Sequence, residues 1–174
     1  MKLIALDGDD TLWQPLSGVN LSDRTPTDEE GWPYFTYAQS QTSPLIAERD
    51  DGARFALRVE ALEVLKVLHE RGLLVGVVSY NHAGNVKRVL DAFGLSDFVD
   101  YVVAEWHTNK DQMLEEMLAA ARRDGHKLDV KDLLLVDDDP SQIYRQQCER
   151  IGAGFCRFGW DITDLRDVLG LLNE

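Results

Sequence analysis

The sequence predicts an α/β fold: a three-layer, Rossmann-like α/β/α sandwich with a central parallel sheet and a β-hairpin flap after the first strand. Two observations lead to this prediction. Short runs of consecutive apolar residues recur along the chain, and such runs are typical of parallel strands buried on both faces. Longer segments with apolar residues at helical spacing lie between them, and this alternation builds right-handed βαβ units.

Five segments are expected to form the strands of the central sheet. Each is short, mainly apolar and followed by polar or turn-forming residues, as buried parallel strands are. The segments are 2–6, 73–78, 98–104, 133–136 and 154–158.

Five helices are expected to connect these strands. The first carries an apolar stripe that begins at Val59, and Gly72 is a typical residue to end it. The others are expected at about 86–94, at 113–125, from near Pro140 and from about 161–164.

The region between the first strand and the first helix has no helical period. Two strand-like runs, Ser43–Glu48 and Ala53–Arg58, flank an Asp-Gly pair that is typical of a hairpin turn. A length of 174 residues suits one domain. We therefore expect a single domain over residues 1–174, with a flap insertion at about 14–58 and no large cap domain.

The composition excludes several classes of function. Thirty-one acidic and 18 basic residues give a formal charge of −13, which disfavours general nucleic-acid binding and docking on anionic lipid. No apolar run approaches the length of about 18 residues that a membrane span needs. In many acidic proteins most of the negative charge serves solubility. The positions of the remaining acidic residues therefore say more about function than the net charge does.

The cysteines and the first residues suggest a compartment. Cys148 and Cys156 are the only cysteines, too few for a disulfide framework or a zinc cluster. The segment Met1–Leu6 has neither the basic region nor the long apolar region of a signal peptide. A cytoplasmic location is the expectation.

Polar side chains follow four of the expected strands, at the sheet edge where open α/β sheets bind ligands. In chain order they are Asp7, Asp9 and Asp10; Ser79; Lys110; and Asp137, Asp138 and Asp139. Taken singly, the last three aspartates are equally typical of a helix N-terminus, and Ser79 of a turn. Lys110 is less easily explained, because a cation in the first turn of a helix opposes the helix dipole.

Together these groups predict a site for a phosphoryl group. Several carboxylates in one place repel one another unless a cation lies between them. Hard oxygen ligands suit Mg²⁺, which also takes phosphate oxygens from a substrate. One of the carboxylates could then attack phosphorus as a nucleophile.

These residues resemble the motifs of the haloacid dehalogenase superfamily. The segment Leu3–Trp13, LIALDGDDTLW, is similar to its D-x-D-x-T motif. Ser79 resembles the second motif, Lys110 the third, and LLLVDDDP the acidic fourth, in the superfamily's order across nearly the whole chain. Within the superfamily the segments DDTLW and VDDDPSQI look most like the magnesium-dependent phosphatases. The resemblance implies the haloacid-dehalogenase-like version of the sandwich.

The resemblance also implies roles for individual residues. Asp7 would be the nucleophile that forms an aspartyl-phosphate, and Asp9 the general acid and then the base. Thr11 would orient the loop of Asp9. The implied contacts to phosphate come from Ser79, Tyr80, Asn81, Lys110 and Thr11. The implied Mg²⁺ ligands are Asp7, Asp9, Asp138 and Asp137, and whether Asp137 or Asp138 binds the metal directly stays open. For Asn81, capping of the next helix is the favoured alternative.

The function implied is a magnesium-dependent phosphomonoester hydrolase acting on a small phosphorylated substrate, a sugar phosphate or a phosphorylated side chain. The alternatives are a phosphotransferase on the same scaffold and a phosphorylated signalling module that does not turn over. The order of the motifs differs from that of receiver domains, which disfavours the last.

Three features of the loops modify this prediction. Gly8 stands where the superfamily commonly has a larger apolar residue, and its freedom is expected to loosen the nucleophile loop. Asp10 adds a negative charge beside the site. Aromatic residues gather in the flap region, and they are expected to form a small core rather than a ring stack for a substrate. They are Trp13, Trp32, Tyr34, Phe35 and Tyr37.

Overall fold

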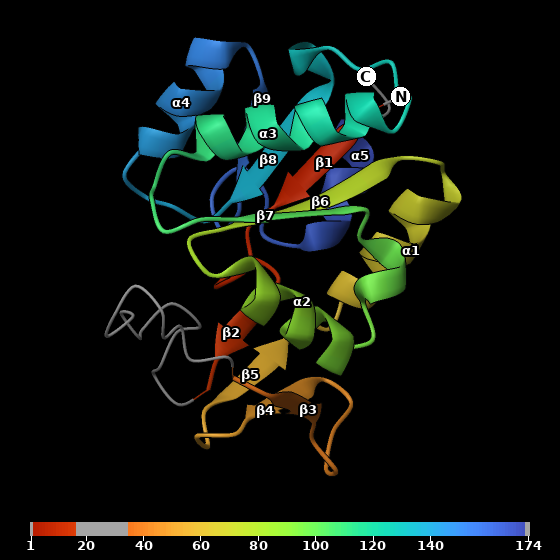
Figure 1. Ribbon diagram of the computed structural model, residues 1–174, viewed down its shortest axis with the longest axis vertical. Helices are drawn as coiled ribbons and strands as arrows, with labels where there is room; N and C mark the ends of the chain where they lie inside the picture. Colours follow the sequence, from red (N-terminus) through yellow and green to blue (C-terminus); the bar gives the residue numbers. More distant parts are fainter. Residues whose placement is uncertain (1, 17–34, 173–174) are drawn as a thin grey trace.

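The computed structural model describes residues 2–16 and 35–172, and a five-stranded parallel sheet lies at its centre (Figure 1). The strand order is β7-β6-β1-β8-β9. The strands are β1 (Leu3–Leu6), β6 (Leu74–Ser79), β7 (Tyr101–Ala104), β8 (Leu133–Asp137) and β9 (Gly154–Arg157). The predicted α/β fold with a central parallel sheet is confirmed.

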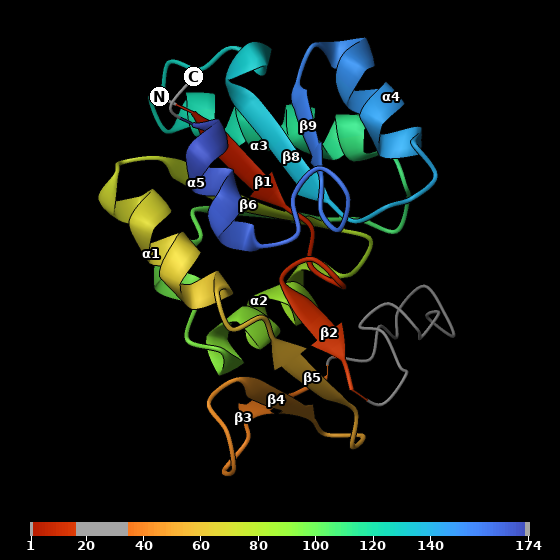
Figure 2. The same cartoon turned by 180° about the vertical axis from the view of Figure 1, so that it is seen from behind.

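The helices cover both faces of this sheet. Helices α3 and α4 pack side by side on one face, and α1 and α5 lie on the other (Figures 1 and 2). The helices are α1 (Ala61–Glu70), α2 (Ala83–Ala92), α3 (Lys110–Arg123), α4 (Ile143–Ile151) and α5 (Val168–Leu171). Short 3₁₀ turns occupy Ser96–Phe98, Val130–Asp132 and Leu165–Asp167.

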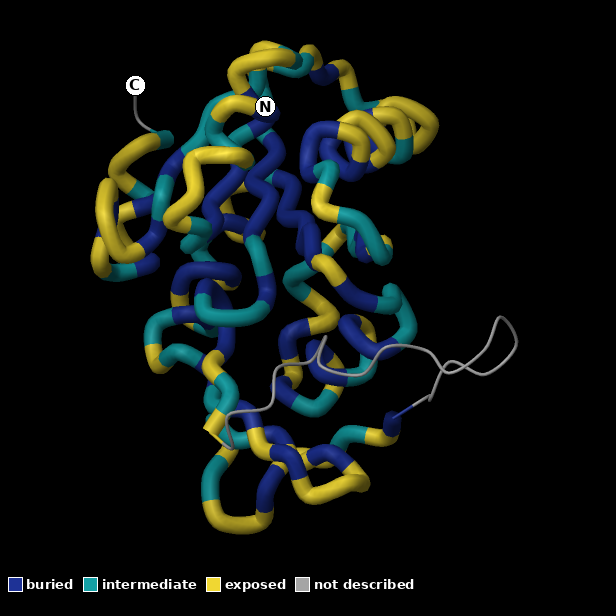
Figure 3. Tube along the Cα trace, turned by 90° about the vertical axis from the view of Figure 1, so that its left-hand side faces the viewer, coloured by how far each residue is buried: buried dark blue, intermediate teal, exposed yellow. Residues whose placement is uncertain are grey.

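Strand β1 shows how the core is divided. Its side chains alternate between the two faces, as they must in a strand. Leu3 and Ala5 belong to the apolar cluster under α3 and α4, whereas Ile4 and Leu6 belong to the cluster under α1 and α2. All four are at most 1% exposed, and the centre of the sheet is buried throughout (Figure 3).

A second, antiparallel sheet lies beyond α2, at the far end of the molecule from α3 (Figure 1). Its strand order is β2-β5-β4-β3. The strands are β2 (Trp13–Pro15), β3 (Tyr37–Gln39), β4 (Ile46–Arg49) and β5 (Arg54–Leu57). The predicted hairpin is confirmed as β4 and β5, and Gly52 adopts φ +88° in its turn. The three-residue strands β2 and β3 are too short to show a period in the sequence.

Several predicted boundaries are wrong, each for a local reason. The strand expected from residue 98 begins at Tyr101, because Ser96–Phe98 forms a 3₁₀ turn. Val59 lies in the turn before α1 and is 73% exposed, so it does not belong to that helix's apolar stripe.

The two C-terminal helices also begin later than predicted. The helix expected near Pro140 begins at Ile143, after a turn closed by side chains. The helix expected near residues 161–164 is a 3₁₀ turn at Leu165–Asp167 followed by α5. Within residues 2–16 and 35–172, no helix is long and apolar enough to cross a membrane.

Candidate active site

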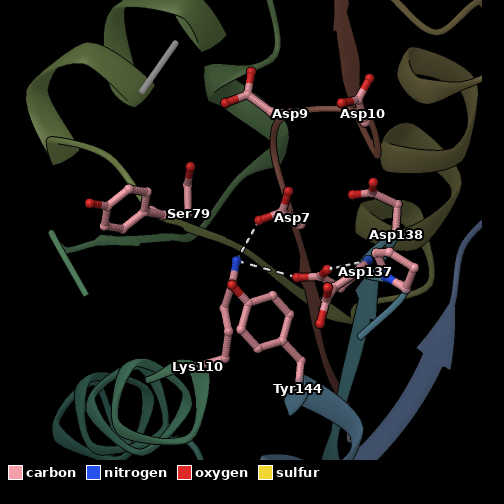
Figure 4. A pocket seen from close by; sticks show the side chains of 11 residues that line it. Asp7, Asp9, Asp10, Ser79, Lys110, Asp137, Asp138 and Tyr144 are labelled. Atoms are coloured by element: carbon pink, nitrogen blue, oxygen red, sulfur yellow. Dashed lines mark hydrogen bonds and ion pairs between the residues drawn. The ribbon is translucent and has the colours of Figure 1, made fainter. Parts of the chain in front are cut away.

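A cavity of about 250 Å³ opens at the carboxyl ends of β1, β6 and β8 (Figure 4). The register pairs Leu6 with Val77 on one side and with Val136 on the other, so the residues after these strands emerge together. The cavity is lined by Asp7, Asp9, Asp10, Ser79, Tyr80, Lys110, Asp137, Asp138, Asp139, Pro140 and Tyr144.

Lys110 lies between two buried carboxylates in this cavity. It is the first residue of α3, and its side chain is only 2% exposed. Its Nζ donates to a carboxylate oxygen of Asp7 and, at 2.7 Å, to the carbonyl oxygen of Val78. The same Nζ lies 3.3 Å from Oδ2 of Asp137 (Figure 4). One ammonium group thus links the ends of β1 and β8.

The pKa values reflect this crowding of charge. Burial raises the pKa of Asp7 well above its ordinary value, and the neighbouring charge of Asp137 adds to the effect, while Lys110 opposes it. Burial alone would lower the pKa of Lys110, but attraction to Asp7 and Asp137 outweighs it and raises that pKa. Burial also raises the pKa of Asp138, with Asp137 and Asp10 adding to the shift. The shift at Lys110 thus favours its charged form, whereas the shifts at Asp7 and Asp138 favour the neutral forms of these carboxyl groups.

Helix α4 holds the backbone around Lys110, a contribution that the sequence does not indicate. The side-chain amide of Gln147 donates to the carbonyl of Thr108 at 3.1 Å and accepts from the N–H of Asp111 at 3.4 Å. The ring of Tyr144 lies 5.3 Å from the Nζ of Lys110. Only the packing of α3 against α4 brings these residues to the site.

The loop after β1 forms a tight turn around Trp13. The N–H groups of Leu12 and Trp13 donate to the carbonyl of Gly8 at 2.9 and 3.1 Å, and the N–H of Asp10 donates to the carbonyl of Trp13 at 2.7 Å. The indole N–H of Trp13 donates to Oδ1 of Asp9 at 3.0 Å. Trp13 therefore orients the carboxylate of Asp9, for which the family resemblance implies the role of acid and base, and the sequence did not reveal this contact.

Gly8 is needed for close packing rather than for flexibility. A Cβ atom at this position would lie 2.5 Å from the indole ring of Trp13. Trp13 itself is fully buried and stacks on Phe93, with ring centroids 6.3 Å apart. The expectation that Gly8 loosens the loop is therefore wrong, because the large indole fills the space that a side chain would need.

The loop after β8 is closed by its own side chains. Oδ1 of Asp137 accepts from the N–H of Asp139 at 2.9 Å, and Oδ1 of Asp139 accepts from the N–H of Ser141 at 3.0 Å. The two loops meet where the hydroxyl of Thr11 donates to Oδ1 of Asp138 at 3.2 Å.

Most of the residues singled out in the sequence come together here. Those that line the cavity are Asp7, Asp9, Ser79, Tyr80, Lys110, Asp137 and Asp138. Thr11 is fully buried behind the cavity, with its hydroxyl directed to Asp138. Asn81 is also buried outside it and accepts from the N–H of His82 at 2.7 Å. His82, rather than Asn81, is the N-cap of α2.

The aromatic residues of the flap region pack inward where they are described. Phe35 is 5% exposed and lies under the guanidinium of Arg49, and Tyr37 packs against Phe55. The prediction that these residues pack in the interior is confirmed, but the predicted small separate core is wrong for Trp13, which belongs to the large apolar cluster under α1 and α2, and Tyr37 packs against that cluster. Trp32 and Tyr34 lie outside the described residues.

The carboxylates do not form a closed metal cage by themselves. Across residues 2–16 and 35–172, no three His, Cys, Asp or Glu side chains converge closely enough to bind a metal ion as a group. The oxygen ligands available at the cavity are aspartate carboxylates that do not converge as a group of three, together with nearby backbone carbonyls. This ligand set suits a cation that keeps several of its waters, as Mg²⁺ does.

Residues 46–151, more than half of the chain, match the family model of the haloacid dehalogenase-like hydrolases. The chain belongs to this hydrolase family. The matched region contains Ser79, Lys110 and the aspartates after β8, and it begins after Asp7 and Asp9. No curated protein sequence matches the chain.

Two solved structures have a fold similar to that of this haloacid dehalogenase-like hydrolase over nearly its whole length. An uncharacterized protein from Listeria monocytogenes serotype 4b has a TM-score of 0.62 and 18% identity, over 99% of this chain and 97% of that chain. A HAD-superfamily hydrolase from Ehrlichia chaffeensis has a TM-score of 0.62 and 16% identity, over 99% and 98%.

The description of a third solved structure of similar fold names a bound metal. It is the N-terminal part of a Bacteroides fragilis protein, described as containing a phosphatase domain complexed with Mg. Its TM-score is 0.56 and its identity 19%, over 99% of this chain and 39% of that chain.

Proposed function

We propose that this hydrolase is a Mg²⁺-dependent phosphomonoester hydrolase that works through an aspartyl-phosphate on Asp7. One observation carries the proposal: Lys110 joins the carboxylates of Asp7 and Asp137 in a cavity that Asp9 and Ser79 also line. A nucleophilic carboxylate, a second carboxylate and a cationic donor on one cavity are what phosphoryl transfer requires. The resemblance to magnesium-dependent phosphatases and the Mg-bound phosphatase domain of similar fold support it.

The residues present fit Mg²⁺. Besides Lys110, which lies between Asp7 and Asp137, the cavity is lined by six aspartates, Asp7, Asp9, Asp10, Asp137, Asp138 and Asp139. Burial and the charges of Asp137 and Asp10 raise the pKa of Asp138, and a bound cation would offset this repulsion. Asp7, Asp138 and the main-chain carbonyl of Asp9 would hold the ion. Asp137 already faces Lys110 and would support the metal site without binding the ion directly. When bound, Mg²⁺ supplies positive charge for the phosphoryl oxygens.

In the first step the carboxylate of Asp7 attacks phosphorus, and the bond from phosphorus to the ester oxygen breaks. Asp9, in its protonated form, gives its proton to that oxygen, so the leaving group departs as an alcohol. The indole of Trp13 holds the other side of this carboxyl group. Lys110 and Ser79 donate to the phosphoryl oxygens, where negative charge develops.

In the second step the carboxylate of Asp9 takes a proton from water, and the water oxygen attacks phosphorus. The bond between Asp7 and phosphorus breaks, and phosphate leaves. Asp9 is protonated again, so the site returns to its starting state. The same side chain serves both steps because each one moves a proton on the side of phosphorus opposite Asp7.

The size of the cavity limits what it encloses. About 250 Å³ is below the range of about 300–1,000 Å³ that is common for small-molecule sites. Tyr80, which is 40% exposed, lines it and packs edge-on against Trp106. We infer that the cavity encloses the phosphoryl group, while the rest of a small substrate, a sugar phosphate or a phosphorylated side chain, extends past Tyr80.

Two other functions use the same groups. A phosphotransferase would pass the phosphoryl group to an acceptor other than water, and a signalling module would keep it for long times. Asp9 favours hydrolysis over a switch, since it stands ready to activate water at the phosphorylated carboxylate. Product analysis separates transfer from hydrolysis.

The test is a phosphate-release assay with p-nitrophenyl phosphate and a panel of phosphorylated metabolites and peptides. We expect turnover with Mg²⁺ and a return to the background rate with excess EDTA. Acid quenching during turnover should leave a phosphoryl group on the peptide that contains Asp7, detected by mass spectrometry. Turnover without a phosphorylated Asp7 peptide would contradict the mechanism, and no turnover with any substrate would contradict the function.

A further inference from the structure

We propose that Arg58 is a positioning residue that holds the loop bearing Asp9 in its working shape. Arg58 lies directly after β5, where the small sheet returns to the core before α1. It is 49 positions from Asp9 in the sequence and outside the cavity. Its effect on rate rests on the proposed function, whereas its effect on the loop does not.

Arg58 donates to three consecutive carbonyl groups of the loop after β1. Its Nη2 donates to the carbonyl of Asp10, and its Nε donates to that of Thr11 at 2.8 Å. Its own backbone N–H donates to the carbonyl of Leu12 at 3.0 Å. One residue thus binds every carbonyl oxygen between Asp9 and Trp13.

The guanidinium is itself fixed in place. Its carbon lies 4.3 Å from the ring centroid of Phe158, a residue just after β9. A cation over an aromatic face is attracted to the ring, and a planar guanidinium stacks well there. The loop is therefore attached through Arg58 to the far edge of the large sheet.

The loop needs such support because of Asp10. This residue has φ +60°, a left-handed conformation that most residues with a side chain adopt only at a cost and that Asp and Asn adopt more readily. Asp10 and Gln142 are the only non-glycine residues with positive φ in the described part of the chain. Backbone conformations of this kind persist where surrounding contacts hold them. Here one such contact is the hydrogen bond from the guanidinium of Arg58 to the carbonyl of Asp10.

The conformation of Asp10 determines where Asp9 points. Asp9 precedes the left-handed residue directly, and its carboxylate is held from the other side by the indole of Trp13. If Arg58 no longer binds the carbonyl groups of residues 10–12, the loop after β1 can relax. The carboxyl group of Asp9 then moves relative to the leaving oxygen of the substrate. Reactions that need a proton from Asp9 should then slow most.

The test uses Arg58→Met, which keeps the apolar stem beside Phe158 and removes the donors. The matched control is Arg122→Met, because the Nε of Arg122 also donates to a backbone carbonyl, that of Leu128, at 2.8 Å. Arg122 lies in the last turn of α3, far along the helix from Lys110. Arg58→Lys is the conservative variant, since lysine retains a cation but not the two-armed geometry.

The first readout is amide hydrogen exchange, which is independent of activity. The N–H groups of Leu12 and Trp13, both bonded to the carbonyl of Gly8, should exchange about tenfold faster or more in Arg58→Met, as expected when charged hydrogen bonds are lost. Arg122→Met should leave them unchanged. Unchanged exchange in both Arg58 variants would overturn the proposal, whatever the activity.

The second readout is kcat/KM, which reports the steps up to the phosphorylated enzyme. For an alkyl phosphate we expect a loss of about 10²-fold in Arg58→Met, the lower range for general acid catalysis. For p-nitrophenyl phosphate, whose leaving group departs without a proton, the loss should stay below about threefold. Arg58→Lys should recover part of the difference.

Equal losses for the two substrates would overturn positioning of Asp9 and leave only a structural role. If Arg58→Met does not fold, Arg58→Lys is tested with both readouts against the same expectations at smaller amplitude. If the wild-type protein hydrolyses neither substrate, the proposed function fails, and hydrogen exchange still decides whether Arg58 holds the loop.

Discussion

The loops after β1 and after β8 meet at one cavity and carry three aspartates each. They differ in which residues form hydrogen bonds to their backbone. Each also contains one left-handed non-glycine residue, Asp10 at φ +60° and Gln142 at φ +65°. The loop after β8 is closed by hydrogen bonds among residues 137, 139 and 141. The loop after β1 has backbone hydrogen bonds of its own between Gly8 and Trp13, but its carbonyl groups also accept from Arg58, nearly 50 positions along the chain.

This difference separates two kinds of site residue. Short polar side chains that bond to the backbone two residues away form a turn from local sequence alone. A loop held by a distant arginine needs the whole chain to be folded first. We therefore expect changes in the loop after β1, and at the lysine that joins the two loops, to have larger effects than changes in the loop after β8.

The largest effect is expected from Asp7→Asn. The amide cannot act as the nucleophile, so kcat should fall by about 10⁴-fold or more. Phosphate release measures the loss, and circular dichroism should show an intact fold. The matched control is Asp10→Asn, which removes the same charge from the same cavity and tolerates the left-handed backbone. It should keep most of the activity, and substantial turnover by Asp7→Asn would contradict the assignment.

Lys110→Met tests the connection between the loops. It leaves the carboxylates of Asp7 and Asp137 buried without their common partner, so the free energy of unfolding should fall by about 3–5 kcal/mol. Urea unfolding in EDTA measures this change. The double variant Lys110→Met/Asp7→Asn should recover part of the loss, because one of the repelling charges is gone. A double variant no more stable than the single one would show that repulsion is not the cause.

Asp139→Ala tests the local closure of the loop after β8. The N–H and hydroxyl of Ser141 lose their acceptor, at a cost of about 0.5–1.5 kcal/mol in the free energy of unfolding. Thermal unfolding measures the change. Ser141→Ala keeps the bond from its N–H to Asp139 and removes the hydroxyl's bond to Asp139 and the bond of 3.4 Å that the hydroxyl accepts from the N–H of Ile143, so it should cost less. A loss of activity as large as that of Asp7→Asn would mean that Asp139 takes part in the reaction.

The smallest effect is expected from Gln142→Gly. Glycine relieves the left-handed strain, worth about 1–2 kcal/mol, but adds about 0.5–1 kcal/mol of unfolded-state entropy. The net gain in stability should therefore be at most about 1.5 kcal/mol, seen as a small rise in Tm. Gln142→Ala keeps the strain and should show no rise. A Gln142→Gly variant less stable than Gln142→Ala would show that the backbone there is not strained.

Much of the large sheet could be predicted from the sequence because its signals are local. Apolar runs mark each of its strands, and the misplaced strand boundary at residue 98 follows from a short 3₁₀ turn that has no period in the sequence. Strands β2 and β3 escaped prediction because three residues each are stabilised by their partners rather than by their own pattern.

The site divides in the same way. The residues that follow the strands, Asp7, Ser79 and Asp137, could be named from the sequence, because chain order puts them at strand ends. Trp13, Gln147 and Arg58 could not be assigned to the site. Each acts through a hydrogen bond to another segment or across a tight turn, and no spacing in the sequence marks it.

By itself, then, the sequence determined which segments are strands of the large sheet and which polar groups end them, since burial and periodicity act over a few residues. The strand order was decided by the tertiary structure, which sets β1 between β6 and β8 and so brings Asp7 and Asp137 to one ammonium group. The net charge of −13 gives no information about the contact of Asp7 and Asp137 with Lys110, or about the burial of these groups. The physical reason is that charges interact through space, at distances of a few ångströms that only the packed sheet creates.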